Sequence, residues 1–312
     1  FFMFSVIFPG QGSQSVGMAK NLYNEFPYVK ELFNNADDIL KIKLSDIIFN
    51  GPKEELNLTI NTQPAIFLVS YSIFTIIKKE TKFNLEKANF FAGHSLGEYS
   101  ALAASDSIVF EDAIKLLKIR AESMQSAVPK GEGGMIAVLG SEINIIKNLL
   151  QENNNKYECY IANDNSLGQI VISGKNKDLE MFSSDLKKNS IKNIKLSVSA
   201  PFHCKLMKHA TEVMKKEIYK INFKPPNNHI ISNVTAKETN EPSEIKDLLI
   251  RQIESPVRWR ESIIYMIDKG TKTFIEIGPG KVLSGLVKRI DKGKNLLSIN
   301  EIEDIKNINL ND

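Results

Sequence analysis

Residues 89–97 read Asn89-Phe90-Phe91-Ala92-Gly93-His94-Ser95-Leu96-Gly97. Residues 89–92 form a short apolar run typical of a strand, and Gly93 to Gly97 have the form G-x-S-x-G. Between a strand and a helix this pattern predicts a nucleophile elbow, in which two glycines permit a sharp turn and expose the serine. The alternative is an ordinary glycine turn, because such pentapeptides also occur by chance.

Ser95 is therefore a candidate nucleophile at the start of the next helix, where the amide of Leu96 can stabilise an oxyanion. A serine nucleophile needs a base, and the chain has four histidines. His203 follows Pro201 at a predicted domain junction, where clefts tend to form, and is the preferred candidate.

The other three histidines fit other roles better. His94 adjoins Ser95, so we expect its side chain to point away from the serine and to pack. His209 lies in a lysine-rich helix and is expected to be solvated, and His229 precedes a strand and can simply be packed.

The elements around the elbow alternate between strands and helices, which predicts an α/β fold with a mostly parallel sheet, like that of the hydrolases. Residues 61–64 (Asn-Thr-Gln-Pro) carry a helix-start signal, and the helix after them is apolar on most sides. The tail after residue 302 is expected to be frayed or loosely held. Strands are predicted at 4–8, 89–92, 229–232 and 273–277, and further helices at 110–124, 201–219, 244–253, 260–269 and 281–289.

A breaker cluster at residues 129–134 interrupts this pattern. The order that follows is strand (135–139), helix (142–152), strand (157–162), strand (169–173), helix (177–188) and strand (194–198). This β-α-β-β-α-β order is that of a ferredoxin-like unit. We therefore expect a small subdomain, residues 129–201, inserted into a large catalytic domain of residues 1–128 and 202–312.

Arg120 lies on the apolar face of the helix predicted at 110–124, where a guanidinium requires an anionic partner. One interpretation is a snorkelling side chain or a structural ion pair, for instance with Glu98. The other is bidentate capture of a substrate carboxylate. The residues alone slightly favour the structural interpretation.

Gly278-Pro279-Gly280 follows a predicted strand and invites a dinucleotide-binding interpretation. The next glycine is Gly285, so the spacing is G-x-G-x4-G rather than G-x-G-x2-G. We reject a dinucleotide site and predict a tight strand-to-helix turn.

Composition excludes several classes of protein. A net charge of +3 over 312 residues is too weak for a nucleic-acid binder. Two cysteines cannot form a disulfide framework, and with four histidines they argue against a structural zinc cluster.

No uninterrupted apolar run reaches the roughly 18 residues needed to cross a bilayer, so no membrane association is expected. The chain does not begin with Met, which is compatible with removal of a transit peptide. The sequence suits a cytoplasmic protein or one of the plastid stroma.

Several motifs together resemble the malonyl-CoA:acyl-carrier-protein transacylases of type II fatty acid synthesis. They extend over almost the whole chain, which makes the combination far more specific than the elbow alone. In order they are Phe8-Pro-Gly-Gln-Gly-Ser-Gln14, Thr62-Gln-Pro-Ala65, Gly93-His-Ser-Leu-Gly-Glu98, Arg120 with Met124, Asn163, Pro201-Phe-His-Cys204, Ser255-Pro-Val-Arg-Trp259 and Glu276-Ile-Gly-Pro-Gly280.

The resemblance implies roles for individual residues. Ser95 would be acylated with His203 as its base, and Gln11 would join the Leu96 amide in the oxyanion hole. Arg120 would bind the free malonyl carboxylate, and the backbone carbonyl of Gln252 would orient the histidine. The residues implied for the acyl pocket are Met124, Asn163 and Phe202.

The resemblance also implies the partners, malonyl-CoA and acyl carrier protein, and implies neither a metal nor a cofactor. Carrier proteins are acidic, so a basic docking surface is expected. Candidates are Lys187, Lys188, Lys192, Lys195, Lys205 and Lys208, and the alternative is an ordinary solvated surface.

Two rival functions remain open. A serine hydrolase or thioesterase would use water as the acceptor, and Arg120 would then be incidental. A non-catalytic carrier-binding or scaffolding protein should lack a serine, histidine or oxyanion residue, and this chain keeps all of them.

Overall fold

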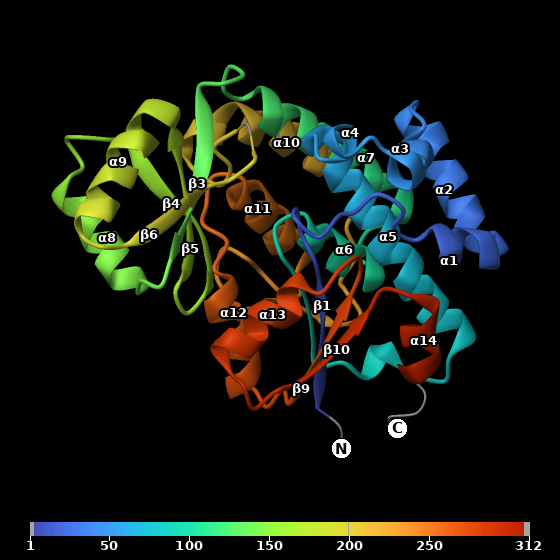
Figure 1. The fold of residues 1–312 in the computed structure, drawn as a ribbon. Coiled ribbons are helices and arrows are strands. Elements are labelled where there is room, and N and C mark those ends of the chain that lie inside the picture. The colour runs from blue at the N-terminus through green and yellow to red at the C-terminus, as the bar shows by residue number, and fades with distance from the viewer. Residues whose placement is uncertain (1–2, 199, 309–312) are drawn as a thin grey trace.

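The computed structural model describes residues 3–198 and 200–308 (Figure 1). Its main sheet has six strands in the order β10-β9-β1-β2-β7-β8. All neighbours pair in parallel except β7 and β8, which are antiparallel, so the predicted mostly parallel sheet is confirmed. The strands are β1 (Phe4–Phe8), β2 (Phe90–Gly93), β7 (His229–Ile231), β8 (Glu238–Thr239), β9 (Thr273–Ile277) and β10 (Asn295–Ile299).

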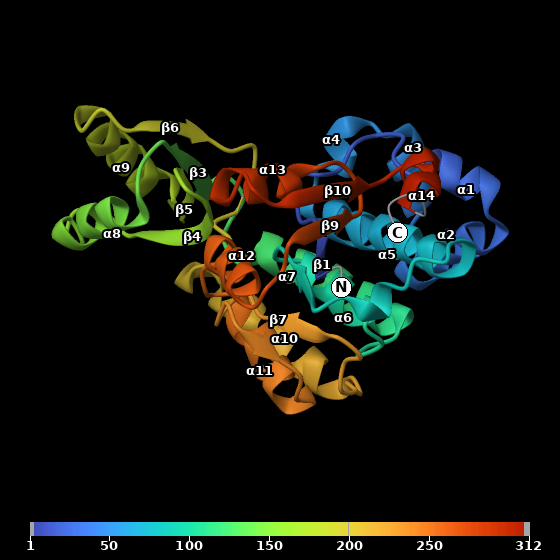
Figure 2. The same cartoon turned by 90° about the horizontal axis from the view of Figure 1, so that it is seen from below.

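The central strands of this sheet are buried on both faces. In β1, Val6 and Phe8 join one apolar core, whereas Ile7, which points to the opposite face, joins another. The first core includes helices α2 (Pro27–Leu40), α5 (Thr59–Glu80), α6 (Gly97–Ala104), α7 (Phe110–Ser126) and α10 (Lys208–Lys220). The second core includes α12 (Trp259–Asp268) and α13 (Val282–Ile290), and α12 lies across β1 from α5 (Figure 2).

Short helices complete the large domain around this sheet. They are α1 (Lys20–Glu25), α3 (Leu44–Asn50), α4 (Lys53–Leu56), α11 (Pro242–Gln252) and α14 (Ile302–Ile308), with 3-10 turns η1 (Leu85–Lys87) and η2 (Lys205–Met207).

Helix α5 is long and apolar enough, by length and composition, to cross a membrane, with a mean hydropathy of 1.4 over its best window. However, 83% of that window is buried inside the protein. The helix is therefore accounted for as the central helix of the core.

The second sheet stands to one side of the first and has helices α8 and α9 on its outer face (Figure 1). Its four antiparallel strands have the order β4-β5-β3-β6, which is the ferredoxin-like arrangement. The elements are β3 (Gly133–Leu139), α8 (Ile143–Glu152), β4 (Cys159–Ser166), β5 (Gln169–Lys175), α9 (Asn176–Lys188) and β6 (Lys192–Lys195). Since all of them lie within residues 129–201, we propose that range as the small subdomain.

Alternation along β3 gives this sheet two different faces. Ile136 and Val138 pack into the subdomain's own core, whereas Met135 and Ala137 line a cavity shared with the large domain. The small subdomain therefore supplies one wall of that cavity.

Several local predictions were wrong. The helix predicted at 201–219 is α10, which begins only at Lys208 after the turn η2, and the strand predicted at 157–162 is β4, Cys159–Ser166. Helix α5 begins at Thr59, because the amides of Asn61 and Thr62 already bond to the Leu58 carbonyl before Pro64 is reached. Strand β6 is Lys192–Lys195, not 194–198. The apolar residues Leu196 and Val198, which suggested a longer strand, line the cavity instead.

The tail is not frayed over residues 302–308. Ile305 and Ile308 of α14 are buried in the main core, three residues apart on one helix face. The rest of the tail, residues 309–312, lies outside the described residues.

Candidate active site

The elbow sits where strand β2 ends and helix α6 begins. A Cβ on Gly93 would lie 1.8 Å from the Gly97 carbonyl oxygen, and one on Gly97 would lie 2.4 Å from that of Phe8, so only glycine fits. Between them Ser95 has φ of +53°, an unfavourable value for a residue with a side chain. This strained turn exposes the hydroxyl to the cavity, as an elbow requires.

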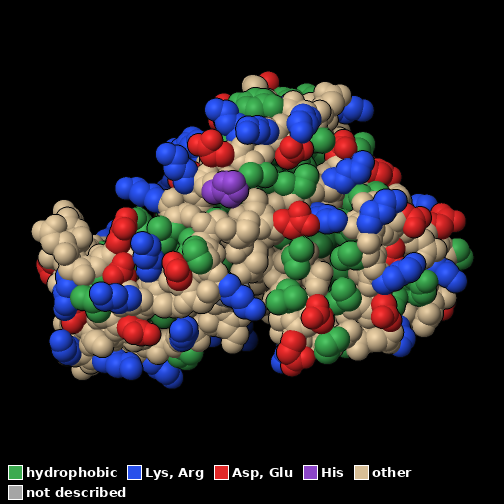
Figure 3. Space-filling view, turned by 90° about the horizontal axis from the view of Figure 1, so that it is seen from above, with side chains coloured by type: hydrophobic (Ala, Val, Ile, Leu, Met, Phe, Trp, Pro, Cys, Tyr) green, Lys and Arg blue, Asp and Glu red, His purple; other side chains and the backbone are tan. Residues whose placement is uncertain are grey.

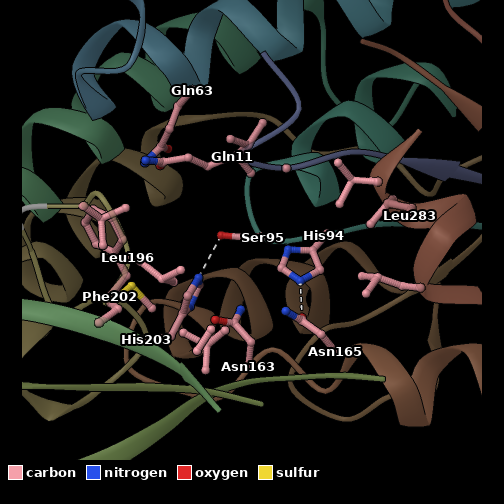
Figure 4. Close-up of a pocket in the computed structure, with 18 of the residues that line it drawn as sticks. Gln11, Gln63, His94, Ser95, Asn163, Asn165, Leu196, Phe202, His203 and Leu283 are labelled. Carbon is pink, nitrogen blue, oxygen red and sulfur yellow. Dashed lines mark hydrogen bonds between the residues drawn. The ribbon is translucent and has the colours of Figure 1, made fainter. Parts of the chain in front are cut away.

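Ser95 and His203 are 108 residues apart and meet in the cavity (Figure 4). His203 Nε2 lies 2.8 Å from Ser95 Oγ, and His203 Nδ1 lies 2.8 Å from the backbone carbonyl of Gln252. A carbonyl only accepts, so Nδ1 carries the proton and Nε2 is free to accept from the serine hydroxyl. His203 also has a positive φ, +57°, so the backbone is strained at both residues of the pair.

His203 is held in its neutral form. Burial lowers its pKa from 6.5 to about 3, and the positive charge of Arg120 acts in the same direction. A neutral imidazole at physiological pH can serve as a general base, which an imidazolium cannot.

Arg120 is 1% exposed and projects from α7 into the site. Its Nη1 donates to Gln63 Oε1 at 2.7 Å, and its Nη2 donates to Gln252 Oε1 at 2.8 Å and to Ser95 Oγ at 3.1 Å. Its Nε is buried with no hydrogen-bond partner in the described part of the chain. Among the described residues no ion pair includes Arg120, so no carboxylate contacts this buried cation directly.

The ion pair with Glu98 considered from the sequence is not formed. Glu98 is buried on α6 and accepts hydrogen bonds from the backbone amide of Asn233 (3.1 Å) and from the side chain of Gln252 (2.9 Å). Burial raises the pKa of Glu98 to about 7.

Two candidate oxyanion donors lie beside the serine. Strands β1 and β2 pair in parallel with Phe8 opposite Gly93, so the loop after β1 and the elbow leave the same sheet edge. Gln11 in that loop lines the cavity, and its Nε2 lies 3.4 Å from Thr59 Oγ1. Leu96 is the N-cap residue of α6. The first N–H groups of a helix have no hydrogen-bond partner within the helix, so the Leu96 amide is a candidate donor to an oxyanion.

The cavity has a volume of about 230 Å³. Met124, Asn163 and Phe202 all line it, as the resemblance implied. Met124 lies one helical turn beyond Arg120, and its sulfur is 3.9 Å from the Gln63 side chain. Asn163 comes from β4 of the small subdomain and forms a parallel bridge with Val257 of the large domain.

His94 also lines the cavity but points away from the serine (Figure 4). Its Nε2 lies 2.7 Å from Asn165 Oδ1, its ring lies 5.5 Å from that of Trp259, and burial lowers its pKa. His209 is exposed, and exposed His229 lies 3.2 Å from Glu238. Among the described residues no three His, Cys, Asp or Glu side chains gather in a way that could hold a metal ion.

Gln63, Glu98 and Asn233 contact the site in ways that the sequence did not predict. Gln63 and Glu98 lie inside motifs noticed in the sequence, which marked them without revealing their contacts. Asn233 had no such signal: its Oδ1 accepts from the Ser95 amide at 2.8 Å, and its Nδ2 donates to the Gly93 carbonyl at 2.7 Å.

Comparisons with known proteins agree on one family. Residues 5–305 match the family described as "Acyl transferase domain". The "Malonyl CoA-acyl carrier protein transacylase" of Bacillus subtilis is 45% identical over 304 aligned residues, and the match covers 96% of this chain and 94% of that protein. An acyl-carrier-protein-S-malonyltransferase of Bartonella henselae is 40% identical, with a TM-score of 0.95 and 98% of each chain covered.

A further similar structure is a malonyl-transacylase solved in complex with a type II PKS acyl-carrier protein. It is 36% identical, with a TM-score of 0.95, and the match covers 99% of this chain and 100% of that one.

Proposed function

This chain belongs to the acyl transferase family, among the malonyl-CoA:acyl-carrier-protein transacylases, and from that premise we propose a role for each residue of its site. The enzyme transfers the malonyl group from malonyl-CoA to the phosphopantetheine thiol of acyl carrier protein. The reaction supplies chain-extender units for fatty acid biosynthesis. The observation that carries our assignment is the Ser95 Oγ–His203 Nε2 contact of 2.8 Å, with His203 Nδ1 against the Gln252 carbonyl.

In the first step, His203 accepts the Ser95 proton at Nε2 while Oγ attacks the thioester carbonyl. The Gln252 carbonyl accepts from Nδ1 and stabilises the imidazolium that forms, in the place of the acid of a hydrolase triad. As the tetrahedral intermediate collapses, the C–S bond breaks, His203 returns the proton to the leaving thiolate, and a malonyl-Ser95 ester remains.

The tetrahedral oxyanion is held by the Leu96 amide and by Gln11. The amide is already oriented by the elbow and by the start of α6. Losing one such donor typically costs about a hundredfold or more in rate.

Arg120 gives the site its preference for malonyl. No described carboxylate contacts it directly, and its unpaired Nε can donate to one. The carboxylate of a malonyl group supplies the missing anion, whereas an acetyl group cannot. Met124, Asn163 and Phe202 form the walls around that group.

In the second step, the carrier-protein thiol replaces CoA. His203 takes its proton, the thiolate attacks the ester carbonyl, and the C–O bond to Ser95 breaks. The proton then returns to Ser95 Oγ, which restores the free enzyme and completes a ping-pong cycle.

The test is the intact mass of the protein after mixing with malonyl-CoA. We expect a malonyl adduct on the wild type and none on Ser95→Ala. Discharge of the isolated adduct should be fast with holo-carrier protein and slow in buffer alone. Equally fast discharge in buffer would instead identify a hydrolase.

We propose that carrier protein docks on the lysine surface, defined as Lys187, Lys188, Lys192, Lys195, Lys205 and Lys208. All six are exposed, and Lys188 lies 3.3 Å from Asp185. Lys and Arg side chains are spread widely over the face seen in Figure 3, among Asp and Glu.

The relatives are bacterial, which favours a cytoplasmic enzyme. A location in the plastid stroma stays a prediction.

A further inference from the structure

One residue joins both halves of the site. The backbone carbonyl of Gln252 accepts from the base, His203, at 2.8 Å, and its side-chain Oε1 accepts from Arg120 Nη2 at 2.8 Å. Gln252 is fully buried at the end of α11. The role implied by resemblance concerns only its backbone carbonyl and leaves the side chain unexplained.

The surroundings permit only one orientation of the Gln252 amide. Its Nε2 faces three acceptors: the Ser95 carbonyl (3.0 Å), Glu98 Oε2 (2.9 Å) and Asn233 Oδ1 (3.3 Å). Turning the amide over would place its oxygen against these acceptors and its NH₂ against the guanidinium. The amide oxygen is therefore directed at Arg120.

The amide also separates the guanidinium from the carboxyl group of Glu98. A carboxylate bonded directly to Arg120 would fix the guanidinium but would neutralise it and compete with a substrate carboxylate. Glu98 lies one hydrogen bond further away, behind the Gln252 amide. The groups that hold Arg120, Gln63 Oε1 and Gln252 Oε1, are both neutral, so the side chain is oriented and keeps its charge.

We propose that the Gln252 side chain is a positioning residue for Arg120 and thereby a determinant of the preference for acyl groups that carry a carboxylate. Glu98 and Asn233 hold the amide in the required orientation. The inference rests on the proposed function, in which Arg120 binds the malonyl carboxylate.

The test compares single-turnover acylation of Ser95 by malonyl-CoA and by acetyl-CoA in two variants. Gln252→Met keeps the backbone carbonyl and most of the volume but removes the acceptor. The malonyl-to-acetyl ratio should fall at least tenfold, while acetyl acylation stays within about threefold of wild type. Gln252→Glu places a carboxylate on Arg120, and the ratio should fall at least as far.

Asn228→Leu is the matched control, because Asn228 is a buried amide that donates to the backbone carbonyls of Glu86 and Ala88 away from the site. We expect its ratio to be that of wild type, with thermal unfolding recorded for all variants. A ratio unchanged in both Gln252 variants overturns the inference, and so does an equal loss with both substrates. Failure of the proposed function is distinguishable, because wild type itself would then form no malonyl adduct.

Discussion

Arg120 is a buried cation held by neutral groups, and that arrangement predicts how its loss would change selectivity. In Arg120→Ala, acylation by malonyl-CoA should fall about a hundredfold or more, since charge-assisted hydrogen bonds contribute about 1.5–3 kcal/mol each. Acylation by acetyl-CoA should be kept or increased. The measurement is the adduct rate with each thioester, and unchanged malonyl selectivity would refute the role.

His203 should leave a signature in the pH dependence. Its pKa is lowered by burial first and by Arg120 second, so the base stays neutral well below pH 6.5. Acylation by acetyl-CoA should therefore lose activity only below pH 6.5, and this acid limb should move upward in Arg120→Gln. Glu98 is a second buried titratable group near the site, with a pKa of about 7. The Glu98→Gln variant removes its titration and so controls for its effect on the acid limb.

The same pKa shift affects stability. Between pH 6.5 and about 3 the unfolded chain binds a proton at His203 that the folded chain does not. The stability contributed by the neutral histidine is thus fully present above pH 6.5 and declines as the pH falls toward 3. If acylation lost activity at or above pH 6.5, the assignment of His203 as a base with a lowered pKa would be wrong.

For individual residues, the sequence pointed more clearly to the proposed nucleophile and base than to the residues that contact them. Ser95 was evident from the elbow, and His203 from its place after the inserted subdomain. Asn233 could not be predicted, because its contact with the Ser95 amide depends on how two loops 138 residues apart are brought together. Such a partner has no local pattern and emerges only when β2 and β7 pair.

At the scale of elements, a partly buried ion pair links the small subdomain to the large one. Arg260 of α12 donates through Nε and Nη2 to both carboxylate oxygens of Asp164 on β4, at 2.8 to 3.1 Å. The two side chains are 19% and 6% exposed. Asp164→Ala should lower the free energy of unfolding by about 2–3 kcal/mol, because it leaves a partly buried guanidinium unpaired.

The matched control is Glu217→Ala, which breaks the exposed pair with Lys220 on α10 and should cost less than about 1 kcal/mol. Urea denaturation of both variants checks the difference. Equal losses would mean that the Asp164–Arg260 pair contributes no more than a surface pair.

Element boundaries were predictable where one physical signal dominated. Strand β9 was predicted at its observed bounds, because its apolar run has a breaker at each end. Strand β6 was predicted at the wrong bounds, because the apolar residues Leu196 and Val198 line the cavity and do not extend the sheet. An apolar residue in a sequence predicts burial, but it does not indicate which part of the protein it will pack against.

In the molecule as a whole, the proposed catalytic groups lie where the two sheets meet. The parallel sheet contributes the loops after β1 and β2, with Gln11 and Ser95, and the antiparallel sheet contributes the wall that includes Asn163. The order of strands and helices along the chain could be predicted from periodicity and from the breaker cluster. A cleft at the domain junction could be expected, but most of its lining could not, because that lining is set only once the two sheets face each other.

The charge of the whole molecule, only +3, conceals where its lysines lie. If carrier protein docks on the lysine surface, discharge of malonyl-Ser95 to holo-carrier protein should slow about tenfold between roughly 50 and 500 mM NaCl, since exposed charges are screened by salt. Discharge to free pantetheine, a small neutral thiol, should change little.

The double variant Lys205→Gln with Lys208→Gln should slow discharge to holo-carrier protein but not discharge to pantetheine. The control pair Lys20→Gln with Lys41→Gln changes the net charge equally near α1 and α2, on the side away from the small subdomain (Figure 1), and should leave both reactions unchanged. Equal effects of the two pairs would show that net charge, rather than this surface, attracts the carrier protein.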